Sequence, residues 1–296
     1  MAHKAQIGIV GYGTVGQAIA DAWNDDISVV ILDTKQEKEE YAKNLAKIPD
    51  CDLIFVCVNT PFSLSKGFVK KNIDDALNSI LGIASSDCPI VIKSAICPMY
   101  TKDHLPKDSR ILVSPEYLSE ANPKRDFFRQ RFMIFGGTDI AIYNKVVEYF
   151  DKHATLFYIN SDNPIVYRYL DAPYKASILK FMENTFLATK VVFMNEWFSR
   201  FVELSYPKSD NANTFKEQWA EMMEAFHLDT RMGNSHFSVP GPDGHWGFGG
   251  KCLPKDLLTS SKIGDSGNLF EHIYDLNVAE YRKEAQDWLE NGGVIE

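Results

Sequence analysis

A glycine-rich turn between two apolar segments constrains the fold of this chain more than any other feature. Residues 5–10 have the composition of a buried strand, and GYGTVG follows at residues 11–16, ahead of a helical pattern. Residues 28–32 then predict a second buried strand, which ends at Asp33. Strand, glycine turn, helix, strand and acid in this order are typical of the βαβ unit that binds a dinucleotide.

Each glycine of this turn has a distinct structural role. Gly11 permits the tight turn, Gly13 lets a pyrophosphate approach the backbone, and Gly16 lets the helix pack closely on the strand. The phosphates would lie at the helix N-terminus, where free N–H groups favour anions. Asp33 follows at the distance where a carboxylate accepts hydrogen bonds from ribose hydroxyls, and it would repel a 2′-phosphate. The cofactor that we expect is therefore NAD.

Short strands and helices continue to alternate after this unit. Further strands are expected at residues 52–58, 89–93, 111–113 and 131–136, and helices at residues 72–84 and 140–150. This alternation predicts an α/β fold class with an N-terminal Rossmann domain, in which a doubly wound and mostly parallel sheet is covered on both faces.

Polar residues follow several of these strands, where ligands of doubly wound sheets bind. Thr60 and Ser94 each come directly after a strand, and SPEYLSE begins at Ser114. Ser114 can cap a short helix that has proline at its first position. Glu116 and Glu120 would then share one helical face, either in a site or on a solvated surface.

The second half of the chain has helical patterns. Residues 176–201 are apolar almost all round, which predicts a buried helix. Lys180 and Asn184 lie four residues apart on it, and they would border a polar cleft or meet an internal ion-pair partner. Further helices are expected at residues 215–226 and 268–290. We therefore expect an NAD-binding domain at residues 1–160 and an all-helical central domain at residues 161–296.

The segment GFGGKCLPKD at residues 247–256 carries the most reactive side chain. Its glycines leave room for backbone or ligand near Cys252. Lys251 and Lys255 flank the sulfur, and a nearby cation favours the nucleophilic thiolate. Asp256 could take a proton or orient a water molecule. On these residues alone, a surface loop with a spare cysteine remains an alternative.

The composition of the chain disfavours several classes of binding partner. A net charge of −9 disfavours nucleic acid and anionic membranes, and no apolar run approaches the roughly 20 residues of a membrane span. No signal peptide is expected, because residues 1–6 lead directly into a strand pattern. The five cysteines form no CxxC pair, which predicts reduced thiols, a cytoplasmic protein and no bound metal.

Several blocks together resemble the UDP-glucose/GDP-mannose dehydrogenase family. They are GYGTVG, VNTP at residues 58–61, SPEYLSE, ILKFMENTFLATKVVFMNE at residues 178–196, DTRMG at residues 229–233, and GFGGKCLPKD. They occur in the order that the family has, and the resemblance covers about residues 4–282. The last motif and the helix block are specific to the family, whereas the first alone would not be.

The resemblance implies a four-electron oxidation of the C6 alcohol of a nucleotide sugar, with UDP-glucose as the commonest substrate, in polysaccharide biosynthesis. The implied catalytic residues are Cys252, Lys180, Asn184, Asp256 and Glu120. The implied cofactor-binding residues are Gly11, Gly13, Thr14, Val15, Gly16, Asp33, Thr60, Ser94, Glu120 and Lys255. The implied substrate-binding residues are Glu116, Tyr117, Leu118, Lys180, Asn184, Arg231, Phe248 and Gly249.

Some features depart from the family pattern. In the family, the helix that corresponds to residues 268–290 leads to a third domain, which binds the nucleotide. We expect no counterpart of that domain in this sequence. Low nucleotide affinity, a partner chain that supplies the grip, or a different substrate are open explanations. Ala95 stands where the family usually has threonine, and the loop PGPDGHW before GFGG is long. The resemblance also implies a homodimer through the central helix.

Three other interpretations are weighed against this one. His236 or His245 could act as the base for Cys252, although a loop histidine is more often solvated. A single-step dehydrogenase of the hydroxyacid or 6-phosphogluconate type would make the cysteine incidental. A non-catalytic NAD-binding remnant would retain only the first domain's role.

Overall fold

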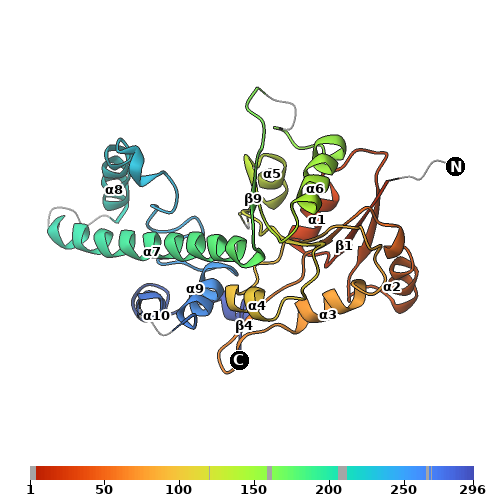
Figure 1. Cartoon of the computed structure of the whole chain (residues 1–296). Coiled ribbons are helices and arrows are strands. Elements are labelled where there is room, and N and C mark those ends of the chain that lie inside the picture. The colour runs from red at the N-terminus through yellow and green to blue at the C-terminus, as the bar shows by residue number, and fades with distance from the viewer. Residues whose placement is uncertain (1–4, 120, 159–161, 206–211, 265–266, 268) are drawn as a thin grey trace. The chain divides into compact units, whose positions relative to one another are not determined.

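The computed structural model describes residues 5–119, 121–158, 162–205, 212–264, 267 and 269–296 (Figure 1). The chain forms two compact units. Unit 1 consists of Met1–Thr60 and Phe68–Lys180, and unit 2 of Pro61–Gly67 and Phe181–Glu296. Each unit has its own hydrophobic core.

Unit 1 is built on a seven-stranded sheet with the order β2-β1-β3-β6-β7-β8-β9. The strands are β1 (Gln6–Val10), β2 (Ser28–Leu32), β3 (Leu53–Val56), β6 (Ile90–Ile92), β7 (Ile111–Val113), β8 (Phe132–Gly136) and β9 (Val166–Leu170). Neighbours are parallel except β7 and β8. The expected doubly wound, mostly parallel sheet is confirmed, and β9 is a strand that the sequence analysis does not predict.

Helices cover both faces of this sheet, with α1, α5 and α6 on one side and α2 and α3 on the other (Figure 1). The helices are α1 (Thr14–Ala20), α2 (Lys38–Leu45), η1 (Ile48–Asp50), α3 (Lys71–Ile80), α4 (Pro98–Asp103), α5 (Pro123–Phe128) and α6 (Ile140–His153). Ile54 of β3 packs in the same core as Leu77 of α3, whereas the next residue, Phe55, packs with Phe150 of α6. Successive strand side chains point to opposite faces, so these fully apolar strands need cover on both sides.

The strand order changes direction beside β1, because β2 lies on one side of it and β3 on the other. Ligands of such sheets bind at the carboxyl ends of the strands where this change occurs. The glycine turn follows β1 there, and residues 57–60 follow β3. The two segments touch, since a Cβ on Gly11 would come within 2.9 Å of the carbonyl group of Cys57.

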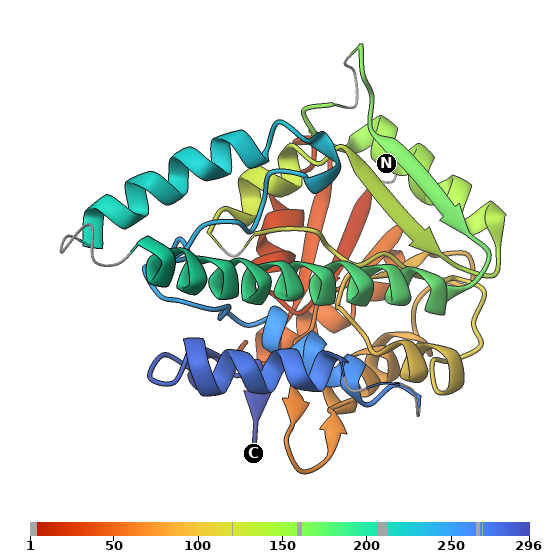
Figure 2. The ribbon, with the colours of Figure 1, turned by 90° about the vertical axis from the view of Figure 1, so that its left-hand side faces the viewer.

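Unit 2 is mainly helical, and its longest element is α7 (Pro173–Ser205), a continuous helix that begins in unit 1 (Figure 2). The other helices are α8 (Ala212–Phe226), η2 (Thr230–Met232), α9 (Leu253–Ser261), α10 (Leu269–Leu276), η3 (Asn277–Tyr281) and α11 (Asp287–Glu290). Phe198 of α7 packs against Trp219 of α8 with ring centroids 5.3 Å apart. Ala188 of the same helix shares a core with Leu257 of α9 and Ile273 of α10.

A small sheet accompanies these helices. Strand β4 (Phe62–Ser63) pairs in parallel with β10 (Val294–Ile295), and β5 (Gly67–Phe68) lies on the other side of β4. Trp288 is fully buried beneath it with Phe62. The second half of the chain is therefore helical as expected, with this short strand pair in addition.

The single helix expected at residues 268–290 is wrong. Helix α10 ends at Leu276, the π-helical turn η3 follows, and helical structure resumes only in α11. The backbone leaves helical geometry at Arg282, with φ of −127°, and the side chain of Arg282 is buried in ion pairs. Contacts with a distant loop, rather than local propensity, therefore end the helix.

The short helix expected after Ser114 is also wrong. Residues 114–119 are irregular, and the Glu116 carboxylate accepts a hydrogen bond from the Leu118 N–H at 2.5 Å. A side chain that bonds the backbone two residues ahead competes with helix formation. Glu116 is therefore not helical, and Glu120, with which it was expected to share a helical face, lies outside the described residues.

Helix α7 is not buried all round, contrary to expectation. Exposed fractions are 59% for Met182, 61% for Phe186, 52% for Phe193 and 51% for Trp197. Their spacing places them on one apolar stripe, which the described residues leave exposed. Among the described helices, none has the length and hydropathy that a membrane span requires.

Candidate active site

The glycine turn of unit 1 has the geometry that a dinucleotide requires. Gly11 has φ of 92°, and a Cβ on Gly16 would lie 2.1 Å from the Gly11 carbonyl oxygen, so neither position accepts a side chain without a backbone shift. A Cβ on Gly13 would meet nothing within 4 Å. Gly13 therefore faces open space at the start of α1, where Thr14 and Val15 begin the helix. The residues present fit a pyrophosphate here.

Asp33 lies beside this turn. Its carboxylate accepts hydrogen bonds from the N–H of Tyr12 at 2.6 Å and of Lys35 at 2.9 Å. These bonds fix the carboxylate at the carboxyl end of β2, where a ribose hydroxyl could reach it. The arrangement fits the adenosine end of NAD.

Thr60 and Ser94 tie the loops after β3 and β6 together. The Thr60 hydroxyl donates to the Ala95 carbonyl at 2.8 Å, and the Ser94 hydroxyl donates to the Val58 carbonyl at 2.7 Å. Both side chains are buried. Since each hydroxyl donates to the backbone, only its oxygen lone pairs remain to accept a bond from a ligand.

The segment after β7 approaches the start of α7 within unit 1. The Lys180 ammonium lies 4.9 Å from the ring centroid of Tyr117, a cation–π contact, and Lys180 is buried. Leu118 packs against the core beneath the sheet. Glu116 and Tyr117 are partly exposed, so this segment places polar groups near a buried ammonium.

In unit 2, the motif cysteine begins a helix. Cys252 is the N-cap residue of α9, and the next turn contains Lys255 and Asp256. Asp256 is fully buried, forms an ion pair with Lys255, and accepts a 2.6 Å hydrogen bond from the Asn184 amide. A helix N-terminus favours a thiolate over a thiol. Unit 2 thus brings a nucleophile, a carboxylate, a cation and an amide donor onto two packed helices, of which Asn184 belongs to α7.

Two of the glycines ahead of Cys252, Gly247 and Gly249, lie against protein side chains. A Cβ on Gly247 would lie 2.3 Å from the Asn277 Oδ1, and a Cβ on Gly249 would lie 2.2 Å from the Arg282 Nη2. At these two positions the absence of a side chain leaves room for Asn277 and Arg282. The neighbouring Phe248 is buried in the core shared by α7 and α9.

The remaining loop residues are more exposed. Arg231 is 81% exposed at its side chain and pairs with Asp229. The rings of His236 and His245 both lie on exposed parts of the loop. In the part of the chain that the structure describes, no three His, Cys, Asp or Glu side chains gather as metal ligands.

Comparison with known proteins decides the family. Residues 40–153 match the NAD-binding domain of the UDP-glucose/GDP-mannose dehydrogenase family, and residues 174–277 match its central domain. The chain belongs to the UDP-glucose/GDP-mannose dehydrogenase family. The expected resemblance and NAD as the cofactor are thereby confirmed, and the family is one of NAD-dependent oxidoreductases acting on CH–OH groups.

Individual relatives agree with this assignment. A UDP-glucose 6-dehydrogenase of Campylobacter jejuni is 27% identical over 312 residues, which cover 92% of this chain and 72% of the relative. The chain spans between 46% and 58% of the length of UDP-glucose 6-dehydrogenases from several Rickettsia species. The chain therefore spans about half the length of several of these relatives and most of the length of another.

Two solved structures share the fold. A UDP-glucose dehydrogenase of the archaeon Pyrobaculum islandicum superposes with a TM-score of 0.65 at 20% identity, over 94% of this chain and 68% of that chain. A 3-hydroxyisobutyrate dehydrogenase of Mycobacterium tuberculosis gives a TM-score of 0.64 at 14% identity, over 96% of this chain and 95% of that chain. At these identities the matches show the fold alone.

A buried lysine that the sequence analysis does not single out lies in unit 1 of this family member. Lys93 directly follows β6, is buried, and places its ammonium 3.3 Å from the Ser114 hydroxyl. Burial lowers the pKa of Lys93 to about 8, an effect that the charge of Glu116 opposes and that of Lys180 reinforces. The signal in the sequence was a lysine closing the apolar run PIVI.

Replacing Lys93 by methionine is expected to stabilise the folded chain at pH 7. The folded-state pKa lies below the unfolded one, so the protonated lysine destabilises the fold below about pH 8, by ~3 kcal/mol at most. This penalty is relieved as the pH rises from about 8 to 10.5. Urea unfolding of wild type and Lys93→Met at several pH values should show a gap that shrinks over that window. A less stable Lys93→Met at pH 7 would show that partners compensate the buried charge, and exposed Lys102→Met serves as the control.

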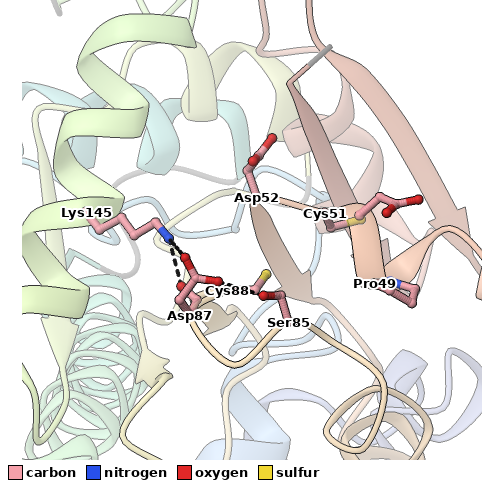
Figure 3. Close-up of a pocket in the computed structure, with 8 residues that line it drawn as sticks. Pro49, Cys51, Asp52, Ser85, Asp87, Cys88 and Lys145 are labelled. Atoms are coloured by element: carbon pink, nitrogen blue, oxygen red, sulfur yellow. Dashed lines mark hydrogen bonds and ion pairs between the residues drawn. The ribbon is translucent and has the colours of Figure 1, made fainter. Parts of the chain in front are cut away.

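A polar hollow of about 200 Å³ lies at the amino ends of β3 and β6, opposite to the edge with the glycine turn (Figure 3). Lys145 reaches into its rim and pairs with Asp87 at 3.0 Å. Burial raises the pKa of Cys51 to about 11 and that of Cys88 to about 12, so both thiols stay protonated at neutral pH. Burial also raises the pKa of Cys57 to about 12. These three sulfurs are therefore poor nucleophiles.

Proposed function

We propose that this chain is an NAD-dependent nucleotide-sugar 6-dehydrogenase of the UDP-glucose 6-dehydrogenase type, which oxidises a C6 alcohol to a carboxylate. The observation that carries the proposal is the arrangement of Cys252, Asp256 and Asn184 within a chain of this family. A nucleophile is needed because two oxidations at one carbon require the intermediate aldehyde to be held.

The proposed reaction consists of two oxidations at C6, with capture of the aldehyde between them, and a final hydrolysis. Two NAD molecules, bound one after the other, would each accept one hydride from C6, and the hydroxyl proton lost in the first oxidation would pass to a base. After the first, the Cys252 thiolate adds to the C6 aldehyde, and the oxyanion takes up a proton to give a thiohemiacetal. Loss of that proton and of the C6 hydride leaves a thioester. Water then adds to the thioester, the C–S bond breaks, and the carboxylate, the Cys252 thiolate and two protons are released.

The side chains of this chain have distinct roles in these steps. Lys180 and Asn184 would stabilise the oxyanions at C6, because a fixed cation and an amide donor favour developing negative charge. The Asn184 amide donates one of its two N–H groups to Asp256, and the second could donate to an oxyanion. Asp256 would orient the water or accept its proton. Glu120, outside the described residues, would hold that water.

The remaining assignments complete the two binding regions. The cofactor would be bound by Gly11, Gly13, Thr14, Val15, Gly16, Asp33, Thr60, Ser94, Glu120 and Lys255. The sugar nucleotide would be bound by Glu116, Tyr117, Leu118, Arg231, Phe248 and Gly249 together with the two α7 residues. The domain roles follow, with NAD on residues 1–160 and the reacting cysteine on residues 161–296.

A panel of nucleotide sugars with NAD tests this proposal, read as NADH formed per limiting sugar. Two NADH per sugar, first with UDP-glucose, is the expected result. The second candidate is a single-step hydroxyacid-type dehydrogenase, which the fold of 3-hydroxyisobutyrate dehydrogenase accommodates over nearly its whole length. One NADH per substrate would favour that candidate. NAD binding with no NADH from any substrate would favour a non-catalytic remnant.

The apolar stripe on α7 supports a homodimer within the same proposal. Large exposed apolar patches usually mark an interface, and Phe186 is the most exposed of the four stripe residues, at 61%. Light scattering at micromolar concentration should give twice the 33.5 kDa of one chain. Phe186→Glu should lower the mass toward that of the monomer, whereas Leu228→Glu, exposed outside α7, should not. A monomeric wild type would contradict the dimer.

A further inference from the structure

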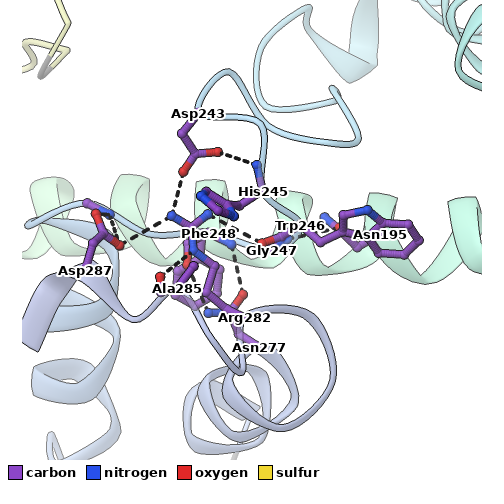
Figure 4. Close-up of polar contacts among 11 residues, drawn as sticks. Asn195, Asp243, His245, Trp246, Gly247, Phe248, Asn277, Arg282, Ala285 and Asp287 are labelled. Carbon is purple, nitrogen blue, oxygen red and sulfur yellow. Dashed lines mark hydrogen bonds and ion pairs between the residues drawn. The ribbon is translucent and has the colours of Figure 1, made fainter. Parts of the chain in front are cut away.

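Three side chains hold the backbone of residues 247–250, which lead to Cys252 (Figure 4). The Asn195 Oδ1 accepts a hydrogen bond from the Gly247 N–H at 3.0 Å. Asn277 bonds Phe248 twice, accepting from its N–H at 2.9 Å and donating to its carbonyl at 3.0 Å. Both asparagines are buried. The two amides come from α7 and η3, so the loop is fixed between elements far apart in the chain.

Arg282 holds Asp287, the third of these side chains, in place. Its side chain is 2% exposed, and its guanidinium contacts Asp243 at 2.5 Å and Asp287 at 3.3 Å. It also donates to the carbonyls of Ala285 at 2.9 Å and Trp246 at 3.4 Å. Asp287 in turn accepts a hydrogen bond from the Gly250 N–H at 3.0 Å. One guanidinium therefore links both ends of the segment 243–250.

Arg282 and the two asparagines that support this loop are polar and buried. Burying a guanidinium and two amides is unfavourable unless each finds its partners, and apolar side chains could fill the same volume. The two amides pair with backbone groups of residues 247–248, just ahead of the nucleophile, and the guanidinium pairs with two carboxylates and two carbonyls around them. The glycines fit the same purpose, since side chains at Gly247 and Gly249 would collide with Asn277 and Arg282.

We propose that Arg282 and Asn277 are positioning residues that act through the backbone of residues 247–250 to hold Cys252 in its reacting place. The proposal rests on the proposed function for the role of the thiol. Neither side chain needs to touch substrate. A planar guanidinium bridges two carboxylates in one geometry, which a lysine cannot reproduce. A displacement of about 1 Å in a reacting group can cost about a hundredfold in rate.

Displacement of the Cys252 thiol should cause one specific defect in the reaction. The first oxidation does not use the sulfur, whereas capture of the aldehyde does. Arg282→Lys should therefore release aldehyde, which an added amine such as hydroxylamine traps, at the expense of carboxylate. A variant that is only partly folded would form less product in total but keep the wild-type ratio of aldehyde to carboxylate. The product ratio thus separates positioning from stability.

The experiment combines this ratio with alkylation of Cys252 by iodoacetamide at pH 7, followed by peptide mapping. For Arg282→Lys we expect a trapped-aldehyde fraction at least tenfold above wild type and alkylation at least fivefold slower, with unchanged NAD affinity. The control Lys283→Gln changes an exposed neighbour and should match wild type. A wild-type product ratio and alkylation rate in folded Arg282→Lys would overturn the proposal.

A second variant keeps the proposal testable if Arg282→Lys does not fold. Asp243→Asn removes a partly exposed carboxylate from the guanidinium and should shift both readouts in the same direction by a smaller factor. Unchanged readouts in Asp243→Asn would then overturn it. If wild type forms no NADH with any nucleotide sugar, the proposed function fails. The alkylation rates still decide whether the support holds the cysteine.

Discussion

Cys252→Ser is expected to lower carboxylate formation by at least about a thousandfold, as the loss of a covalent nucleophile typically does. A serine hydroxyl is not ionised at neutral pH, so it does not capture the aldehyde as a thiolate would. The first oxidation requires no sulfur, and the variant should therefore release aldehyde that an added amine traps. Carboxylate and NADH are measured together, by mass spectrometry and absorbance.

The matched control is Cys88→Ala, at a buried thiol in the hollow of unit 1. It should retain near-normal carboxylate formation, because Cys88 is protonated at neutral pH and lies at the opposite edge of the sheet from the glycine turn. If Cys252→Ser produced carboxylate at the wild-type rate, covalent capture would have no place in the mechanism.

Lys180→Ala is expected to lower turnover at least about a hundredfold at saturating substrate. Losing one preorganised oxyanion donor typically costs about 2.7–4 kcal/mol of barrier. Lys180 is suited to this role because it is buried and held against the Tyr117 ring. The rate constant kcat should fall while the affinity for NAD, measured by fluorescence titration, stays near that of wild type.

Lys175→Ala provides the comparison, since Lys175 lies on the same helix and forms an exposed ion pair with Asp171. Such pairs contribute little to stability, so turnover and melting temperature should both stay near wild type. A near-normal kcat in Lys180→Ala would remove Lys180 from the mechanism.

The parts of the fold that depend on local pattern could be predicted from the sequence. The strand before Gly11, the helix after it and the strand before Asp33 form at the expected residues. Their signals are short apolar runs and glycines within one βαβ unit, where spacing in sequence fixes spacing in the fold. The candidate cysteine and its neighbours could be named for the same reason, because they lie within ten residues.

The parts that depend on distant partners could not be predicted. The Asn184–Asp256 bond joins residues 72 positions apart, and Arg282 reaches Asp243 across 39 positions. The pattern of residues within a helix does not reflect such contacts, so the break at residues 282–286 was not foreseeable. The exposed face of α7 was missed because apolar composition alone does not distinguish burial within a chain from burial against another.

Lys93 shows a further limit. A lysine at the end of an apolar strand can as easily point to solvent as into the protein, because its stem is long and flexible. The structure places it against the Ser114 hydroxyl instead. Its pKa, lowered chiefly by burial, is a property of the surrounding fold rather than of the segment that carries it.

Acid quenching during turnover, followed by mass spectrometry of the peptide that contains Cys252, tests the covalent scheme most directly. With NAD and UDP-glucose, or whichever nucleotide sugar yields NADH, a sugar-acyl adduct should be found on that sulfur and should disappear once substrate is exhausted. Steady production of carboxylate with Cys252 unmodified at every quench time, and freely alkylated throughout, would contradict the scheme.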